Sequence, residues 1–122
     1  MSSALPQMGE RDLVRLFIEQ VPYAIPDARV FQREILNVET AQGWRARAGV
    51  AGQADCYALV KGGRHIEIEA KAVKHKWYAR QLAWRQFCQE WGIPYLVLKA
   101  NTGESPPQTV ERWIALLRSL CT

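Results

Sequence analysis

Residues 55–73 read DCYALVKGGRHIEIEAKAV. Two runs rich in apolar residues, 55–60 and 65–73, stand on either side of Lys61-Gly62-Gly63-Arg64. Glycines at such a position supply the positive φ angles that tight turns between strands require. The pattern therefore predicts a β-hairpin.

The second strand of this hairpin alternates apolar and polar residues. Because alternate residues of a strand point to the same face, its polar members share one side. These are His65, Glu67, Glu69 and Lys71. One interpretation is a half-buried strand with a solvated, charged face. The other is that Glu69, Lys71 and Asp55, at the start of the preceding strand, gather around something on which they act.

The rest of the chain predicts helices and strands on both sides of the hairpin, from apolar spacing and from glycine and proline positions. The further predicted elements are a helix at 10–21, a strand at 28–38, a loop or short ragged strand at 39–54, a helix at 77–91, a strand at 95–100, a turn at 101–108 and a helix at 109–120. The order α-β-β-β-α-β-α predicts one α/β domain with a mixed sheet flanked by helices.

The composition fits a single intracellular domain. A chain of 122 residues, 48% of them hydrophobic, is long enough to bury a core, and a net charge of +4 permits a polyanionic partner. Cys56, Cys88 and Cys121 are widely spaced without a CxxC pair, which indicates reduced thiols. Since no apolar run approaches 18 residues and no hydrophobic signal core is present, we predict a cytoplasmic protein without a membrane span.

Asp55, Glu69 and Lys71 have the chemistry of a minimal phosphodiesterase site. Two carboxylates that converge on one point form a hard-oxygen site for Mg²⁺ or Mn²⁺, which keeps several water ligands. Such a metal lowers the pKa of a bound water and offsets the charge that builds on a phosphate. A lysine two residues along the same strand can orient that water or neutralise the phosphate oxygens.

The helix predicted after the hairpin places a polar residue on an apolar face. At 100° per residue, Gln81 falls within the stripe formed by Trp77, Trp84, Cys88 and Trp91. An amide on such a face costs on the order of 1–3 kcal/mol unless it is hydrogen-bonded. Gln81 therefore needs a specific partner, either a backbone carbonyl of the sheet or a group of the site.

The spacing of these residues resembles the PD-(D/E)xK nuclease superfamily, in which an Asp precedes a hairpin turn and then Glu-x-Lys. More narrowly, GQAD, IEIEAK, RQ and WGIPYLVL are similar to the virus-type replication-repair nuclease (VRR-NUC) domain. These segments begin at residues 52, 66, 80 and 91, and the similar region runs from 44 to 99.

The resemblance implies a restriction-endonuclease-like fold and a role for each matching residue. The implied roles are binding of Mg²⁺ or Mn²⁺ by Asp55, Glu69 and the backbone carbonyl of Ala70, assistance to catalysis by Lys71, and support of the site by Gln81. Family members often add a Glu from the first helix. Glu10 is the candidate because it shares a helix face with Leu13 and Phe17; its alternative is a first-turn residue favoured by the helix dipole.

The register of the hairpin tests this interpretation. A two-residue Gly62-Gly63 turn would place Asp55 opposite Ala70, on the side away from Glu69. A three-residue loop would pair Asp55 with Lys71 instead, and a bulge would serve equally well. The site interpretation therefore predicts an odd-length connection or a bulge.

Basic residues flank the proposed site in sequence and are mixed with aromatic residues. The candidates for phosphate contacts are Arg45, Arg47, Lys74, His75, Lys76 and Arg80. Such contacts give sequence-independent affinity for nucleic acid. The alternative is solubilising charge at loop tips.

The resemblance further implies a DNA partner, branched or duplex, in a bacterial or phage-infected cell. By analogy with small junction-resolving and flap-type enzymes of the family, it also implies a homodimer. Two alternatives remain open: a catalytically inactive nuclease-fold module that binds DNA, and a structural domain with a charged hairpin. Convergence of the Asp55 and Glu69 carboxylates beside Lys71 would argue against the structural domain.

Overall fold

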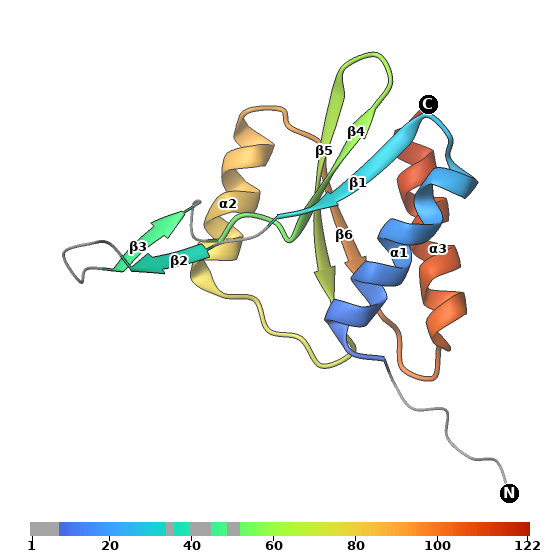
Figure 1. Ribbon diagram of the computed structural model, residues 1–122, viewed down its shortest axis with the longest axis horizontal. Coiled ribbons are helices and arrows are strands. Elements are labelled where there is room, and N and C mark those ends of the chain that lie inside the picture. Colours follow the sequence, from blue (N-terminus) through green and yellow to red (C-terminus); the bar gives the residue numbers. More distant parts are fainter. Residues whose placement is uncertain (1–7, 34–35, 40–44, 49–51) are drawn as a thin grey trace, which may run out of the picture.

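A four-stranded mixed β-sheet lies at the centre of the molecule (Figure 1). The computed structural model describes residues 8–33, 36–39, 45–48 and 52–122, with the backbone alone for 36–39 and 45–48. In spatial order the strands are β1 (Ala28–Gln32), β4 (Cys56–Val60), β5 (Arg64–Lys71) and β6 (Tyr95–Lys99). The first three pair antiparallel, and β6 lies parallel to β5.

Three helices flank this sheet. Figure 1 shows α1 (Glu10–Ala24) and α3 (Pro106–Leu120) side by side on one face, and α2 (Ala79–Glu90) on the other. Because parallel strands need a crossover connection, α2 joins β5 to β6. The predicted α/β class and the order α-β-β-β-α-β-α of the elements that build this sheet are thus confirmed.

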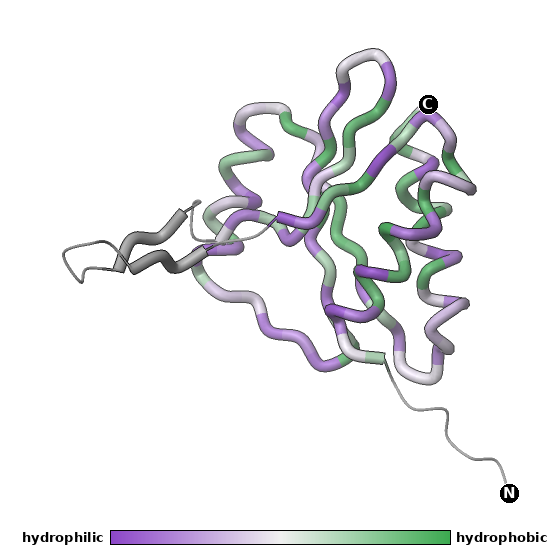
Figure 2. The backbone as a smooth tube through the Cα atoms, in the orientation of Figure 1, coloured by the Kyte–Doolittle hydropathy of each residue, from purple (hydrophilic) through white to green (hydrophobic). Residues whose placement is uncertain are grey.

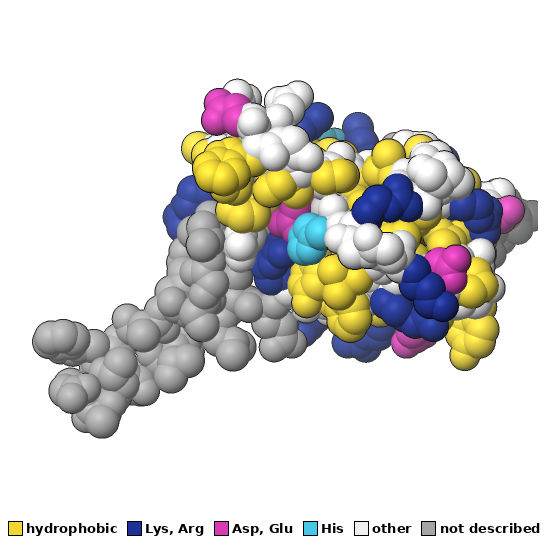
Figure 3. Space-filling view, turned by 90° about the horizontal axis from the view of Figure 1, so that it is seen from above, with side chains coloured by type: hydrophobic (Ala, Val, Ile, Leu, Met, Phe, Trp, Pro, Cys, Tyr) yellow, Lys and Arg dark blue, Asp and Glu magenta, His cyan; other side chains and the backbone are white. Residues whose placement is uncertain are grey.

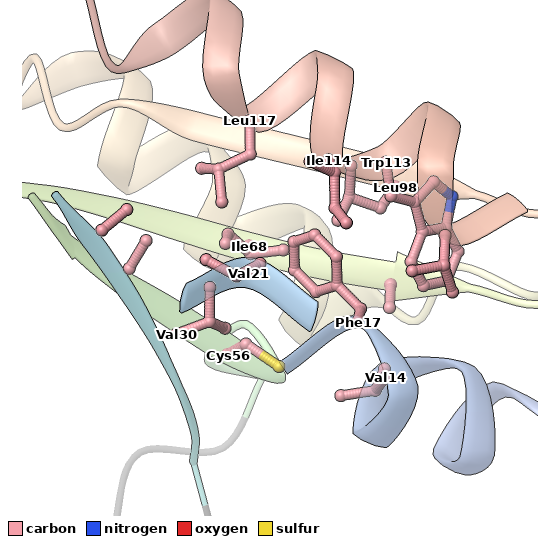
Figure 4. Close-up of a cluster of buried hydrophobic side chains, with 14 of the residues drawn as sticks. Val14, Phe17, Val21, Val30, Cys56, Ile68, Leu98, Trp113, Ile114 and Leu117 are labelled. Atoms are coloured by element: carbon pink, nitrogen blue, oxygen red, sulfur yellow. The ribbon is translucent and has the colours of Figure 1, made fainter. Parts of the chain in front are cut away.

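The hydrophobic core lies between the sheet and the pair α1 and α3. The predicted apolar face of α1 is buried, and Phe17 meets Trp113 of α3 edge to face with ring centroids 5.9 Å apart (Figure 4). Ile68 of β5 and Leu98 of β6 pack into the same cluster. Figure 2 shows hydrophobic residues concentrated in these layers, whereas α2 is more hydrophilic. In α2, Cys88 is the one buried residue.

Two predicted boundaries are wrong for identifiable reasons. The strand expected at 28–38 is divided, because β4 begins at Cys56 and offers β1 little to pair with beyond Arg33. β2 (Leu36–Glu39) instead pairs with β3 (Arg45–Ala48) in a separate hairpin. The last helix begins at Pro106 rather than 109, because Ser105 caps it and proline suits the first helical turn.

Within the part of the chain that the structure describes, the helices are all too short or too polar to cross a bilayer.

Candidate functional site

The β4–β5 hairpin brings Asp55 to the same side as Glu69 and Lys71. Its loop is Lys61-Gly62-Gly63, and Val60 pairs with Arg64. The predicted odd-length connection is therefore confirmed. The predicted partner is wrong: continuing the register from Cys56↔Ile68 places Asp55 opposite Glu69, because the loop begins one residue before Gly62.

Three of the four polar side chains on this face of β5 are buried and only His65 is exposed, so the interpretation of a solvated strand face is wrong. Glu67 and Glu69 are each 1% exposed and Lys71 is 4% exposed. Burying ionised groups is unfavourable unless they are paired and hydrogen-bonded. The hydrogen-bond and ion-pair partners of these three side chains must therefore be identified within the protein.

Glu69 has a complete set of contacts. Its Oε1 accepts a hydrogen bond from Gln81 Nε2 at 3.1 Å and lies 3.4 Å from Lys71 Nζ. Its Oε2 accepts from the Asp55 backbone N–H at 3.2 Å. Burial and, after it, the neighbouring charge of Asp55 raise the pKa of Glu69 to about 8, although Lys71 and the Asp55 N–H act in the opposite direction.

Asp55 lies against Glu69 at the beginning of β4. Its Oδ2 accepts a hydrogen bond from the Ala70 N–H at 3.0 Å, and its backbone N–H donates to Glu69 Oε2 at 3.2 Å. Burial raises the pKa of Asp55 despite these contacts. The N–H and C=O of one strand residue point to the same neighbour, so the Ala70 carbonyl faces the same side as Asp55.

Lys71 and Gln81 join this carboxyl pair to α2. Lys71 Nζ donates to Gln81 Oε1 at 2.9 Å and to the Lys76 carbonyl at 3.1 Å, and it lies 4.6 Å from the centre of the Trp77 ring. Gln81 Oε1 also accepts from the Tyr78 N–H, so this amide caps α2 as well as contacting the site. The specific partners expected for the Gln81 amide are thus found: they are the side chains of Lys71 and Glu69 rather than a backbone carbonyl of the sheet.

A cationic cleft of about 730 Å³ opens beside Lys71 and Gln81. Three of the predicted phosphate contacts line it: Lys74, His75 and Lys76. His75 Nδ1 is buried there without a hydrogen-bond partner. Arg80 is exposed on α2 but is not part of this lining. Arg45 and Arg47 belong to β3, and their side chains lie outside the described residues.

Glu10 also lines the cleft, from the first turn of α1. Burial raises its pKa, and the charge of Asp55 raises it further, so the two carboxyl groups influence each other. The backbone of Ala72 provides a compensating hydrogen bond. Its role as a metal ligand stays a prediction.

The oxygen atoms around Asp55 and Glu69 form a partial set of donors for a divalent cation. Among the described residues, no group of three or more His, Cys, Asp or Glu side chains is arranged to hold a metal ion. Asp55, Glu69 and the Ala70 carbonyl are hard-oxygen donors at one end of the hairpin. A Mg²⁺ ion fits such a set, since it is commonly held by one or two carboxylates and retains several waters.

A second polar cluster, which the sequence did not predict, surrounds Glu67. Arg33 donates two hydrogen bonds to its carboxylate, at 2.8 and 3.0 Å, and Trp84 Nε1 donates one at 2.9 Å. His65 Nε2 lies 2.5 Å from Glu67 Oε2. Burial alone would raise the pKa of Glu67, but these hydrogen bonds lower it overall. The sequence pattern that could have indicated this cluster is the position of Glu67 on the same strand face as Glu69.

The chain was compared with known proteins. No protein-family model matches it, and a search of curated proteins finds no significant match. The interpretation of the site therefore rests on its geometry and on the motif resemblance.

Proposed function

We propose that this protein is a Mg²⁺- or Mn²⁺-dependent DNA endonuclease of the PD-(D/E)xK type, similar to VRR-NUC domains. The observation that carries the proposal is the buried cluster of Asp55, Glu69 and Lys71, which lies at the edge of a cationic cleft. Burying two carboxyl groups and a lysine costs free energy, because charged groups lose their contacts with water. Metal-dependent phosphodiester hydrolysis is a reaction that requires such a set of groups.

Asp55, Glu69 and the Ala70 carbonyl would hold the metal ion. When bound, it would supply a more acidic water and would offset negative charge on the phosphate. The two carboxyl groups repel each other when both are ionised, and a divalent cation between them would relieve that repulsion.

Lys71 would act on the phosphate through its ammonium group. Gln81, the Lys76 carbonyl and the Trp77 ring hold that ammonium within 3.4 Å of Glu69. A cation fixed in this way is placed before the reaction begins and needs little reorganisation as charge develops. Gln81 contacts both Lys71 and Glu69, so we assign it a positioning role.

Lys74, His75 and Lys76 would contact the DNA backbone. They line the cleft into which Lys71 and Gln81 face, and phosphate contacts of this kind position nucleic acid without reading its sequence. Branched or duplex DNA as substrate, a homodimeric enzyme and a cytoplasmic location follow from the family resemblance and form part of the proposal.

An inactive DNA-binding module is the second candidate. It is favoured by one observation, the lack of a third carboxylate joined to Asp55 and Glu69 among the described residues. Such a module would bind DNA through the same cleft and would need no metal ion.

The test is cleavage of branched, single-stranded and duplex DNA with Mg²⁺, with Mn²⁺ and with EDTA, comparing the wild type with Lys71→Ala. We expect metal-dependent cleavage by the wild type and a rate about 10²- to 10³-fold lower for the variant. Lys61→Ala is the matched control, because Lys61 lies in the β4–β5 loop at the other end of the strands and its side chain is 80% exposed. DNA binding without cleavage would favour the inactive module.

A further inference from the structure

Two exposed cations adjoin Lys71 on the side of β6, the last strand of the sheet. Lys99 of β6 is the register partner of Lys71 on β5, so the two side chains point to the same face of the sheet. Arg85 belongs to α2, which covers that face (Figure 1). Arg85 and Lys99 are exposed, whereas Lys71 is buried. We call Arg85 and Lys99 the β6-edge cations.

One aromatic ring connects Arg85 to the candidate site. The centre of the Trp77 ring lies 4.6 Å from Lys71 Nζ and 5.4 Å from Arg85 Cζ. Arg85 Cζ also lies 5.9 Å from the centre of the Tyr95 ring on β6. A guanidinium that stacks on aromatic rings is weakly hydrated, and its planar set of N–H groups loses little freedom when it binds a phosphate. Arg85 is therefore suited to binding an anion beside the site.

The β6-edge cations lack a counter-ion within the described part of the chain. There, neither Arg85 nor Lys99 forms an ion pair with a carboxylate, whereas Lys71 has Glu69 at 3.4 Å. Like charges directly opposite each other on neighbouring strands are destabilising, and Lys71 and Lys99 form such a pair. An anion bound from outside the protein would relieve this repulsion.

Charges near the β4–β5 loop are arranged differently. Figure 3 looks onto the end of the molecule that carries this loop, where cationic and acidic side chains lie beside one another. Lys61 of the loop, for example, lies 3.5 Å from Asp27 Oδ1. Interspersed charges of both signs are typical of a surface that keeps a protein soluble. Cations without counter-ions beside a candidate active site instead attract a polyanion.

Two separate groups of cations therefore adjoin Lys71. The first comprises Lys74 and Lys76, which line the cationic cleft together with Lys71. The second comprises the β6-edge cations, which are not part of that lining. A nucleic-acid backbone that contacts both groups must cross the end of β5 at Lys71, beside the carboxyl pair.

We propose that the β6-edge cations bind backbone phosphates of DNA next to the phosphate on which Lys71 acts. This inference rests on the proposed nuclease function and defines the path of its substrate, which runs from the cationic cleft across Lys71 to β6. Contacts on both sides of the phosphate that is cleaved hold it in place for the reaction. Such contacts position the DNA without reading its sequence.

The test is binding of a fluorescent DNA duplex in EDTA, where metal-dependent cleavage cannot occur, over a series of salt concentrations. Arg85→Gln and Lys99→Gln should each weaken binding. Each should also reduce the slope of the logarithm of the binding constant against that of the salt concentration by about one, and the double variant by about two. Lys99→Gln should not lower the midpoint of urea unfolding, since it removes a charge opposite Lys71. Arg15→Gln is the matched control, because Arg15 is exposed on α1, across the sheet from α2.

Slopes that stay at the wild-type value in Arg85→Gln and Lys99→Gln would overturn the inference, as would an equal reduction in Arg15→Gln. If the wild type then still cleaves DNA with Mn²⁺, the nuclease proposal stands without this path. Reduced slopes in the two variants of a protein that cleaves no DNA with Mn²⁺ would support the β6-edge cations as DNA contacts and refute the nuclease.

Discussion

Glu67 is expected to be a principal anchor between the sheet and α2, and Glu67→Gln tests this. The substitution keeps the size of the side chain and one oxygen that can accept from Trp84 Nε1. It removes the charge and replaces an acceptor with an amide group that faces other donors. Arg33, whose side chain is 18% exposed, would then lose its bidentate carboxylate partner.

The expected loss is large for a single isosteric change. Removing one partner of a buried ion pair costs about 3–5 kcal/mol, and the partial exposure of Arg33 places the expectation near the lower end, at about 3 kcal/mol. That is a substantial part of the roughly 5–15 kcal/mol by which domains are stable. In a domain of this size it corresponds to a fall in Tm of more than about 10 °C.

The assay is urea unfolding followed by circular dichroism, with the free energy of unfolding taken from the midpoint and slope. Glu90→Gln is the matched control, because Glu90 lies on α2, is exposed and accepts one hydrogen bond from Gln86. We expect that control to change the free energy of unfolding by less than about 0.5 kcal/mol. If Glu67→Gln costs no more than Glu90→Gln, the cluster around Glu67 does not anchor α2.

Two further predictions concern local structure. Gly52→Ala should destabilise by more than about 2 kcal/mol, because Gly52 has φ of +87° and an added Cβ would lie 2.3 Å from the Arg80 carbonyl oxygen. Gly62→Ala, at φ of +98° with open space around it, should cost only about 1–2 kcal/mol, and equal losses in urea unfolding would contradict the close approach. Glu104→Gln should lower the free energy of unfolding by about 1 kcal/mol at pH 7, because hydrogen bonds from Arg112 lower the pKa of Glu104 from 4.5 to about 2. The ionised Glu104 carboxylate stabilises the folded protein fully above pH 4.5, and this contribution is lost as the pH falls to about 2. The difference in the free energy of unfolding between the two proteins should therefore shrink over that range. A difference independent of pH would refute the assignment.

The parts of the fold that the sequence predicted are those encoded by local patterns. The apolar spacing in α1 depends on residues within a few turns, and the alternation in β5 on residues two apart. The candidate site could be predicted from the sequence for the same reason. Asp55, Glu69, Lys71 and Gln81 belong to one hairpin and the helix that follows it, so short connections bring them together.

The parts that the sequence did not predict depend on contacts between distant residues. Arg33 and Glu67 are 34 positions apart, and nothing in the local pattern of either residue indicates the pairing. The predicted apolar stripe of the helix at 77–91 is only partly buried, for a related reason. Trp84 donates to Glu67 and Cys88 is buried, but Trp91, in the same predicted stripe, is 72% exposed. The period of a helix shows which residues share a face, but not how far its partner extends.

The most direct test of the proposed metal-dependent site is the single-turnover rate of DNA cleavage as a function of Mn²⁺ concentration, for the wild type and for Asp55→Asn. We expect the wild-type rate to saturate with Mn²⁺ and to be abolished by EDTA. We also expect Asp55→Asn to need more Mn²⁺ to reach half of its maximal rate, because one oxygen ligand has lost its charge. Cleavage that persists in EDTA, or an Asp55→Asn variant with the wild-type rate and Mn²⁺ dependence, would contradict the proposed site.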